Sequence, residues 1–93
     1  MLKVNEYFNG TVKSIALKNE EGVATIGVME IGEYEFGTST VENMTITSGA
    51  LEVILPGETA WKTYTKGETF VVEKDKSFKV KANEQVAYYC LYK

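Results

Sequence analysis

Apolar and polar residues alternate with a period of two along most of this chain. In NMTITS, residues 43–48, Met44 and Ile46 alternate with threonine, and in SFKVKA, residues 77–82, phenylalanine and valine alternate with lysine. This is the period of a strand with one buried face, and no window shows a sustained helical period. Further strands are predicted at 11–17, 23–29, 33–37, 50–55, 60–65, 69–73 and 86–92.

Short segments of turn residues separate the predicted strands. Gly-Glu occurs at three of these junctions, beginning at Gly32, Gly57 and Gly67. Nine short strands in a chain of 93 residues predict a single all-β domain over residues 1–93, either a barrel or a jelly-roll sandwich of antiparallel strands. Closing the sheet would also remove exposed strand edges.

The last predicted strand, VAYYCLY at 86–92, has no polar face. A strand that is apolar on both faces lies either between two sheets or at a subunit interface. We favour the interface, because a domain this small gains much from enlarging its core. The strand therefore predicts a homodimer.

The composition excludes several chemistries. The chain has a net charge of −3, and its ten cationic residues are all lysine, with no arginine and no histidine. A Ser-His-Asp triad, a histidine metal site and an arginine fork for phosphate are therefore impossible. The acidic balance argues against nucleic acid as a partner, because no basic patch can displace its counterions.

One cysteine and the apolar character of the first residues bear on the compartment. Cys90 is the single cysteine, so an internal disulfide is excluded, and its apolar neighbours predict a packed, unreactive thiol. The start MLKVNEYF lacks the apolar stretch of a signal peptide, and no run approaches membrane-spanning length. We expect a cytoplasmic protein with no membrane partner.

The middle of the chain resembles the cupin superfamily of small jelly-roll barrels. Glu42, six residues and then Gly49 reproduce the end of the first cupin motif, and GALEV follows as the usual turn and strand. The two histidines of that motif would fall on Phe36 and Thr38, or on Glu35 and Gly37 when the spacer is one residue longer.

The second cupin motif has lost its metal ligand as well. Gly67 begins the motif, but the histidine place holds Phe78 and the asparagine place holds Ala82. A lone glutamate cannot hold a transition metal tightly, because such sites need three or four ligands. A cupin-like barrel without a metal is therefore expected, and a metal enzyme of the cupin type is disfavoured.

Motifs along nearly the whole chain resemble the small cupin-type pyrimidine/purine nucleoside phosphorylases. They are NEYFNGTVKSI, GVMEIGEYEFGTS, ENMTITSGALEVILPG and the terminal YYCLY, in that order. The resemblance implies a cytoplasmic transferase that needs no cofactor, takes nucleosides and inorganic phosphate, and releases the free base and α-ribose 1-phosphate, with wide tolerance for the base. This chain departs from the family pattern at Leu91, where an arginine is frequent, and at Glu73, where a proline is common.

The cupin spacing also suggests which side chains face the interior. If the places of the lost ligands point inward, Glu42 is the one inward carboxylate, and we predict it as the catalytic residue, with a pKa raised by desolvation. It could accept hydrogen bonds from ribose hydroxyls, although a glutamate at a loop or rim is nearly as plausible. The predicted substrate-binding residues are aromatic groups that could stack a base or fill the core, and hydroxyls that could cradle phosphate: Tyr34, Phe36, Thr38, Ser39, Phe78, Tyr88 and Tyr92.

A second hypothesis comes from a different class of protein. The same aromatic interior would serve a non-catalytic barrel that binds a small molecule. Phosphate-dependent release of base from a nucleoside separates the two.

Overall fold

The computed structural model describes residues 1–93 and contains ten strands and no helix. It confirms the all-β prediction, and the strands agree with those expected from the alternation to within a few residues at their ends. None of the elements is a helix long and apolar enough to cross a membrane. The strands are β1 (Val4–Tyr7), β2 (Val12–Asn19), β3 (Gly22–Met29), β4 (Gly32–Gly37), β5 (Glu42–Ser48), β6 (Ala50–Ile54), β7 (Lys62–Thr65), β8 (Thr69–Val72), β9 (Ser77–Ala82) and β10 (Val86–Tyr92).

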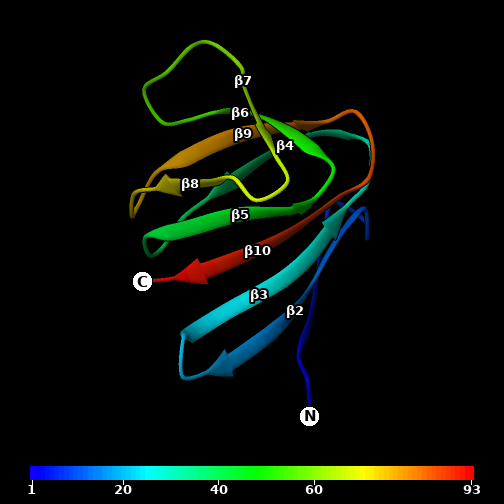
Figure 1. Cartoon of the computed structure of the whole chain (residues 1–93), viewed down its shortest axis with the longest axis vertical. Helices are drawn as coiled ribbons and strands as arrows, with labels where there is room; N and C mark the ends of the chain where they lie inside the picture. Colours follow the sequence, from blue (N-terminus) through cyan, green and yellow to red (C-terminus); the bar gives the residue numbers. More distant parts are fainter.

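The strands form two antiparallel sheets that enclose the core (Figure 1). The larger sheet has the order β1-β2-β3-β10-β5-β8, and the smaller has the order β4-β9-β6-β7. In Figure 1 the red β10 lies between the cyan β3 and the green β5, so the last strand of the chain is inserted between two strands from earlier in the chain. The central position of β10 brings its side chains against both neighbours, and this decides where the site forms.

The period-two alternation corresponds to an inner and an outer face on each strand. On β9, Phe78 and Val80 are buried, whereas Lys79 between them is exposed. On β5, Met44 and Ile46 are buried in the same way. The predicted inner rows are therefore confirmed, and they meet in one cluster of sixteen buried apolar residues.

The first strand, β1, was not predicted from the sequence. Its four residues, VNEY, show no clean alternation, and its burial pattern has no inner row. It pairs only with β2, with Tyr7 opposite Val12, and so it forms the edge of the larger sheet. The pairing across the β1–β2 hairpin holds β1 in place, and a single-strand pattern cannot reveal it.

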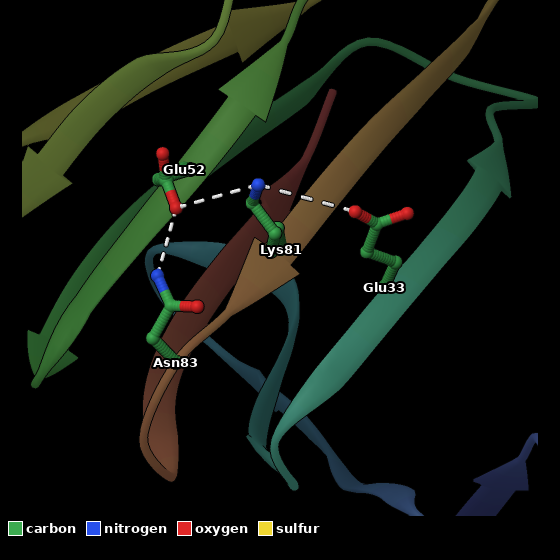
Figure 2. Close-up of polar contacts among 4 residues, drawn as sticks. All are labelled: Glu33, Glu52, Lys81 and Asn83. Atoms are coloured by element: carbon green, nitrogen blue, oxygen red, sulfur yellow. Dashed lines mark hydrogen bonds and ion pairs between the residues drawn. The ribbon is translucent and has the colours of Figure 1, made fainter.

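The outer face of the smaller sheet carries a ladder of charges. Lys81 on β9 lies 4.0 Å from Glu33 on β4 and 4.0 Å from Glu52 on β6, and Asn83 donates to Glu52 at 2.8 Å (Figure 2). The Lys81 ammonium also lies 4.7 Å from the centre of the Trp61 ring. Opposite charges on directly paired strands stabilise the sheet modestly, so this face is an ordinary solvated one.

The outer face of the larger sheet is apolar instead. Ile15, Ile26 and Tyr89 are successive partners across β2, β3 and β10, and Val28 and Leu91 lie beside them. Ile15, Ile26 and Val28 are each more than 40% exposed. One row of β10 thus faces the core, and the other lies on this surface, which we call the outer apolar face. The strand is not sandwiched between the two sheets of one chain.

Candidate functional site

A cavity of about 110 Å³ lies between the two sheets, on the side where β1 and β4 form their edges. It is closed mainly by aromatic and sulfur-containing side chains, and Glu42 is the only charged residue in its wall. The wall consists of Tyr7, Ser14, Met29, Phe36, Gly37, Glu42, Met44, Phe78, Tyr88, Cys90 and Tyr92.

The inner row of β10 supplies one side of the cavity. Tyr88, Cys90 and Tyr92 are spaced by two residues, so all three point to the same face of the strand. The neighbouring β3 leaves space for the first of them, Tyr88, because its residue there is Gly27 and a side chain at Gly27 would overlap the Tyr88 ring. The Tyr92 hydroxyl makes a hydrogen bond of 3.0 Å with the Thr25 hydroxyl, which fixes that ring at the far end of the row.

Glu42 begins β5 and lies directly opposite Tyr92 on β10. Its side chain is half-buried, and the Cys90 thiol donates a weak hydrogen bond of 3.6 Å to its carboxylate. Burial raises the pKa of Glu42 above its ordinary value of 4.5, and the bond from the Cys90 thiol opposes that rise. The spacing from Glu42 to Gly49 is the length of β5, because Gly49 makes the β5–β6 turn with φ +84°.

Burial also raises the pKa of three other groups in the wall, Cys90, Tyr88 and Tyr92. Burial, with the nearby Glu42 charge as the second cause, raises the pKa of the Cys90 thiol to about 12. Burial also raises the pKa of Tyr88 to about 12 and that of Tyr92 further above its ordinary value. Cys90 is 1% exposed, which confirms the predicted packed thiol. Glu42 is therefore the one carboxylate in the wall, and the raised pKa values of Cys90, Tyr88 and Tyr92 keep those three groups protonated at neutral pH.

Aromatic rings from β4, β9 and β1 form the opposite side. Phe36 on β4 and Phe78 on β9 are cross-strand partners with ring centroids 5.8 Å apart. By the resemblance to the cupin motifs, Phe78 occupies a histidine place, and Phe36 does so in one of the two possible spacings. Tyr7 meets the Phe36 ring edge-on at 6.3 Å, so β1 completes this wall.

The structure brings five of the eight predicted site residues together and leaves three apart. The five that line the cavity are Phe36, Glu42, Phe78, Tyr88 and Tyr92. Tyr34 is buried next to Phe36, but its hydroxyl donates to the Glu30 carbonyl at 2.7 Å and does not reach the cavity. Ser39 is exposed in the loop after β4 and is not part of the wall.

Thr38 has a structural explanation for its burial. Its hydroxyl donates to the Glu73 carbonyl at 2.6 Å and accepts from the Lys76 amide at 3.0 Å, and its own amide donates to the Lys76 carbonyl at 2.8 Å. These bonds join the end of β4 to the β8–β9 turn, so the substrate-binding role predicted for Thr38 gains no support from this cavity.

Six residues of the wall were not predicted as site residues: Tyr7, Ser14, Met29, Gly37, Met44 and Cys90. Ser14 is a polar residue at an inner position of β2, and it accepts a bond of 3.3 Å from the Asn5 amide. The alternation of β2, in which Val12 and Ser14 share a face, could have identified it. Tyr7 had no such signal, because β1 shows no inner row.

Comparison with known proteins places the chain in a family. The sequence model of the pyrimidine/purine nucleoside phosphorylases matches residues 2–92. A protein of that name from Alcanivorax borkumensis is 58% identical over 92 residues, which cover 99% of this chain and 98% of the relative. The chain belongs to the pyrimidine/purine nucleoside phosphorylase family.

Solved structures establish the fold. A protein of unknown function from Vibrio parahaemolyticus superposes with a TM-score of 0.93 at 43% identity, covering 97% of this chain and 96% of that one. An RmlC-like cupin from Shewanella frigidimarina superposes with a TM-score of 0.75 at 20% identity, covering 96% and 80%. The predicted cupin-like jelly roll is thus confirmed for this nucleoside phosphorylase family member.

Glu42 and Cys90 are the only residues in the cavity wall of the types that ligate transition metals strongly, and no group of three or more such side chains occurs in the chain. Two ligands, one of them a thiol with a pKa near 12, do not make the three- or four-ligand set that a tight metal site needs.

Proposed function

We propose that this chain is a nucleoside phosphorylase of broad base specificity that works without a metal. The observation that carries the proposal is the 58% identity, over almost the full length of both chains, to a relative named for that activity. The cavity supports it, because it joins one carboxylate to a wall of aromatic rings.

The reaction is a transfer of a pentosyl group, and its bond changes set what the site must supply. The bond from C1′ to the base nitrogen breaks with its electron pair going to the base, and an oxygen of phosphate bonds to C1′. The proton of hydrogen phosphate ends on the base. Because the sugar passes through an oxocarbenium-like state, a nearby negative charge stabilises it.

Glu42 is placed to supply that charge. In the half-buried cavity its carboxylate has only the weak Cys90 thiol as a protein donor, so it retains acceptor capacity for the 2′- and 3′-hydroxyls of ribose. The attraction between this carboxylate and the sugar becomes stronger as the sugar becomes cationic. It therefore favours the transition state over the bound nucleoside.

The wall contains no lysine, so phosphate would be bound by neutral donors, and its charge would be repelled by ionised Glu42. The aromatic wall offers π faces to any base, and stacking on such faces is tolerant of base identity. This is the physical basis of the proposed broad specificity.

The test is release of base from uridine and from inosine by purified protein, with and without inorganic phosphate. We expect release only with phosphate, and we expect Glu42→Gln to lower kcat by about 100-fold, the scale for loss of one charged group from a reacting site. Glu35→Gln is the matched control, because Glu35 is exposed on the outer side of β4. Binding of nucleoside without turnover in the wild type would instead establish the non-catalytic barrel.

We also propose that two copies associate through the outer apolar face. The centre of this face carries no charge, and its one ion pair, Lys13 with Glu6 at 3.5 Å, lies at the edge toward β1. Two copies with a net charge of −3 each can approach over a neutral surface, and a two-fold axis would place identical apolar rows against each other.

The expected mass in analytical ultracentrifugation is twice the 10.4 kDa of one chain. Tyr89→Glu should reduce it to 10.4 kDa, because a charge would be buried in the contact. Thr59→Glu, in the exposed β6–β7 loop, should leave the mass unchanged. A monomeric wild type would refute the association. A cytoplasmic location stays part of the same proposal and is consistent with the single free thiol.

A further inference from the structure

The cavity is smaller than the ligand that the proposed function requires. Its volume is about 110 Å³, whereas sites that enclose drug-sized molecules have volumes of about 300 Å³ or more. Only part of a nucleoside can therefore lie inside. Since Glu42 lies in the interior wall and is the group suited to the ribose hydroxyls, the base must extend toward the mouth.

The mouth is identified by the exposure of the wall. Among the lining residues only Tyr7 on β1 and Gly37 at the end of β4 are exposed, and Tyr7 is 45% exposed. These two residues come from the edge strands of the two sheets, and β1 and β4 share no backbone hydrogen bonds. The rings of Tyr7 on β1 and Phe36 on β4 meet across this seam between the sheets.

The segment after Tyr7 has an unusual backbone. Phe8, Asn9 and Gly10 all have positive φ angles, of +52°, +58° and +82°. This region is uncommon for asparagine and unfavourable for a bulky residue such as phenylalanine, so something must hold Phe8 there. The sequence contains Asn9-Gly10, a pair suited to a tight turn, yet the turn is displaced by one residue onto Phe8 and Asn9, with the Gly10 amide donating to the Tyr7 carbonyl at 3.1 Å.

The Phe8 ring supplies the compensating contacts. Its centroid lies 5.0 Å from that of Tyr34 and 5.5 Å from that of Phe36, the second in an edge-to-face arrangement. Phe8 thereby fastens the tip of the hairpin to β4, and the adjacent Tyr7 ring is left over the mouth with one side toward the cavity and one toward solvent. Tyr7 is the only exposed aromatic residue in the wall.

We propose that Tyr7 stacks on the base of the nucleoside at the cavity mouth and that Phe8 is the positioning residue that holds it there. The inference rests on the proposed function. It assigns the sugar to the interior beside Glu42 and either a purine or a pyrimidine to the Tyr7 ring. A base that is held by stacking and is partly solvated is not selected by hydrogen bonds to its edges, so both purines and pyrimidines are accepted.

The experiment measures KM for inosine, uridine and phosphate separately in the wild type and in Tyr7→Ala, Tyr7→Phe and Trp61→Ala. Stacking on an aromatic side chain corresponds to a change of about 5- to 150-fold in affinity. Tyr7→Ala should raise KM for the nucleosides by that factor, more for inosine with its larger ring system, and should leave KM for phosphate unchanged. Tyr7→Phe should restore the wild-type value. Trp61→Ala removes an aromatic residue that lies over Lys81, away from the cavity, and should have no effect.

Phe8→Gly tests the positioning role apart from folding. Glycine removes both the strain of the positive φ and the ring contacts with Tyr34 and Phe36, which act on stability in opposite directions. The thermal midpoint should therefore stay near that of the wild type while KM for nucleosides rises. An unchanged nucleoside KM in Phe8→Gly would overturn the role of Phe8.

The outcomes also separate this inference from the proposed function. An active wild type with an unchanged nucleoside KM in Tyr7→Ala, or with an equal rise in KM for phosphate, overturns the role of Tyr7 and leaves the function standing. A wild type without phosphate-dependent release overturns the function, and calorimetric titration with inosine then decides the role of Tyr7. Weaker inosine binding in Tyr7→Ala than in the wild type supports it, and equal or absent binding in both overturns it.

Discussion

Substitution of Gly27 by alanine should displace Tyr88 into the cavity. A Cβ atom at Gly27 would lie 2.3 Å from Cζ of Tyr88 and 2.4 Å from its hydroxyl oxygen, whereas ordinary contact begins at 3.4 Å. The ring must therefore retreat by about 1 Å. The backbone of Tyr88 cannot follow, because it is paired with β3 on one side and β5 on the other. The side chain must rotate instead, and the cavity is the open space beside it.

The expected cost follows from this geometry. Forcing extra volume into a packed site costs about 1–3 kcal/mol, and an off-rotamer torsion costs about 1 kcal/mol of this. A loss of about 2 kcal/mol lowers the thermal midpoint by roughly 8–16 °C in a domain of this size. Because the displaced ring enters a cavity of only about 110 Å³, we expect nucleoside turnover to fall by more than tenfold.

The assay is thermal unfolding monitored by circular dichroism, with base release measured below the midpoint. Gly37→Ala is the matched control for stability, since its Cβ would meet nothing closer than the Lys76 carbonyl at 3.9 Å. Tyr88→Phe should not relieve Gly27→Ala, because Cζ remains, whereas Tyr88→Val should. The double variant Gly27→Ala/Tyr88→Val should be about as stable as Tyr88→Val alone. Additive losses in that double-variant cycle, or a Gly27→Ala protein as stable as the wild type, would refute the reasoning.

Three further predictions concern the charged and thiol groups. Burial raises the pKa of Glu42 above 4.5, so the folded chain retains a proton that the unfolded chain releases, and the free energy of unfolding should fall as the pH rises from 4.5 through the folded-state pKa. Urea unfolding across that pH range should show this slope in the wild type and a weaker one in Glu42→Gln, and equal slopes would contradict the assignment. Cys90, with a pKa of about 12, should not react with a thiol reagent at pH 8 until urea unfolds the chain, and rapid labelling of the native protein would count against the packed thiol. Lys81→Met should cost about 1 kcal/mol or less in low salt and almost nothing in 1 M salt, because both ion pairs, to Glu33 and to Glu52, are long and partly exposed; a salt-independent loss would show that packing against Trp61 matters more.

Much of the site was open to prediction because it depends on local spacing. Glu42 follows from its position seven residues before Gly49, which is the length of β5, and the resemblance to the cupin motifs suggests Phe78 and, in one of its two spacings, Phe36. Tyr88 and Tyr92 follow from the period of two on β10. Each is a statement about residues on one strand, and a strand's period is carried by its own sequence.

Thr38 shows where such reasoning stops. Its inner position was predicted and it is buried, but the bonds that account for its burial go to Glu73 and Lys76 on a distant turn. Tyr7 shows the opposite case, a residue in the cavity wall on a strand without a pattern.

The sequence by itself determined the all-β class, the inner and outer rows, the absence of a histidine metal site and the place of Glu42. Only the tertiary structure decided that β10 lies between β3 and β5, that Gly27 makes room for Tyr88, and that Tyr7 and Phe8 close the seam beside β4. The physical reason is that alternation specifies which face of a strand is buried, whereas the neighbours of that strand depend on pairings between distant segments. Those pairings form the cavity. The space that Gly27 leaves and the exposed ring of Tyr7 become part of it only because the strands that carry them are brought together.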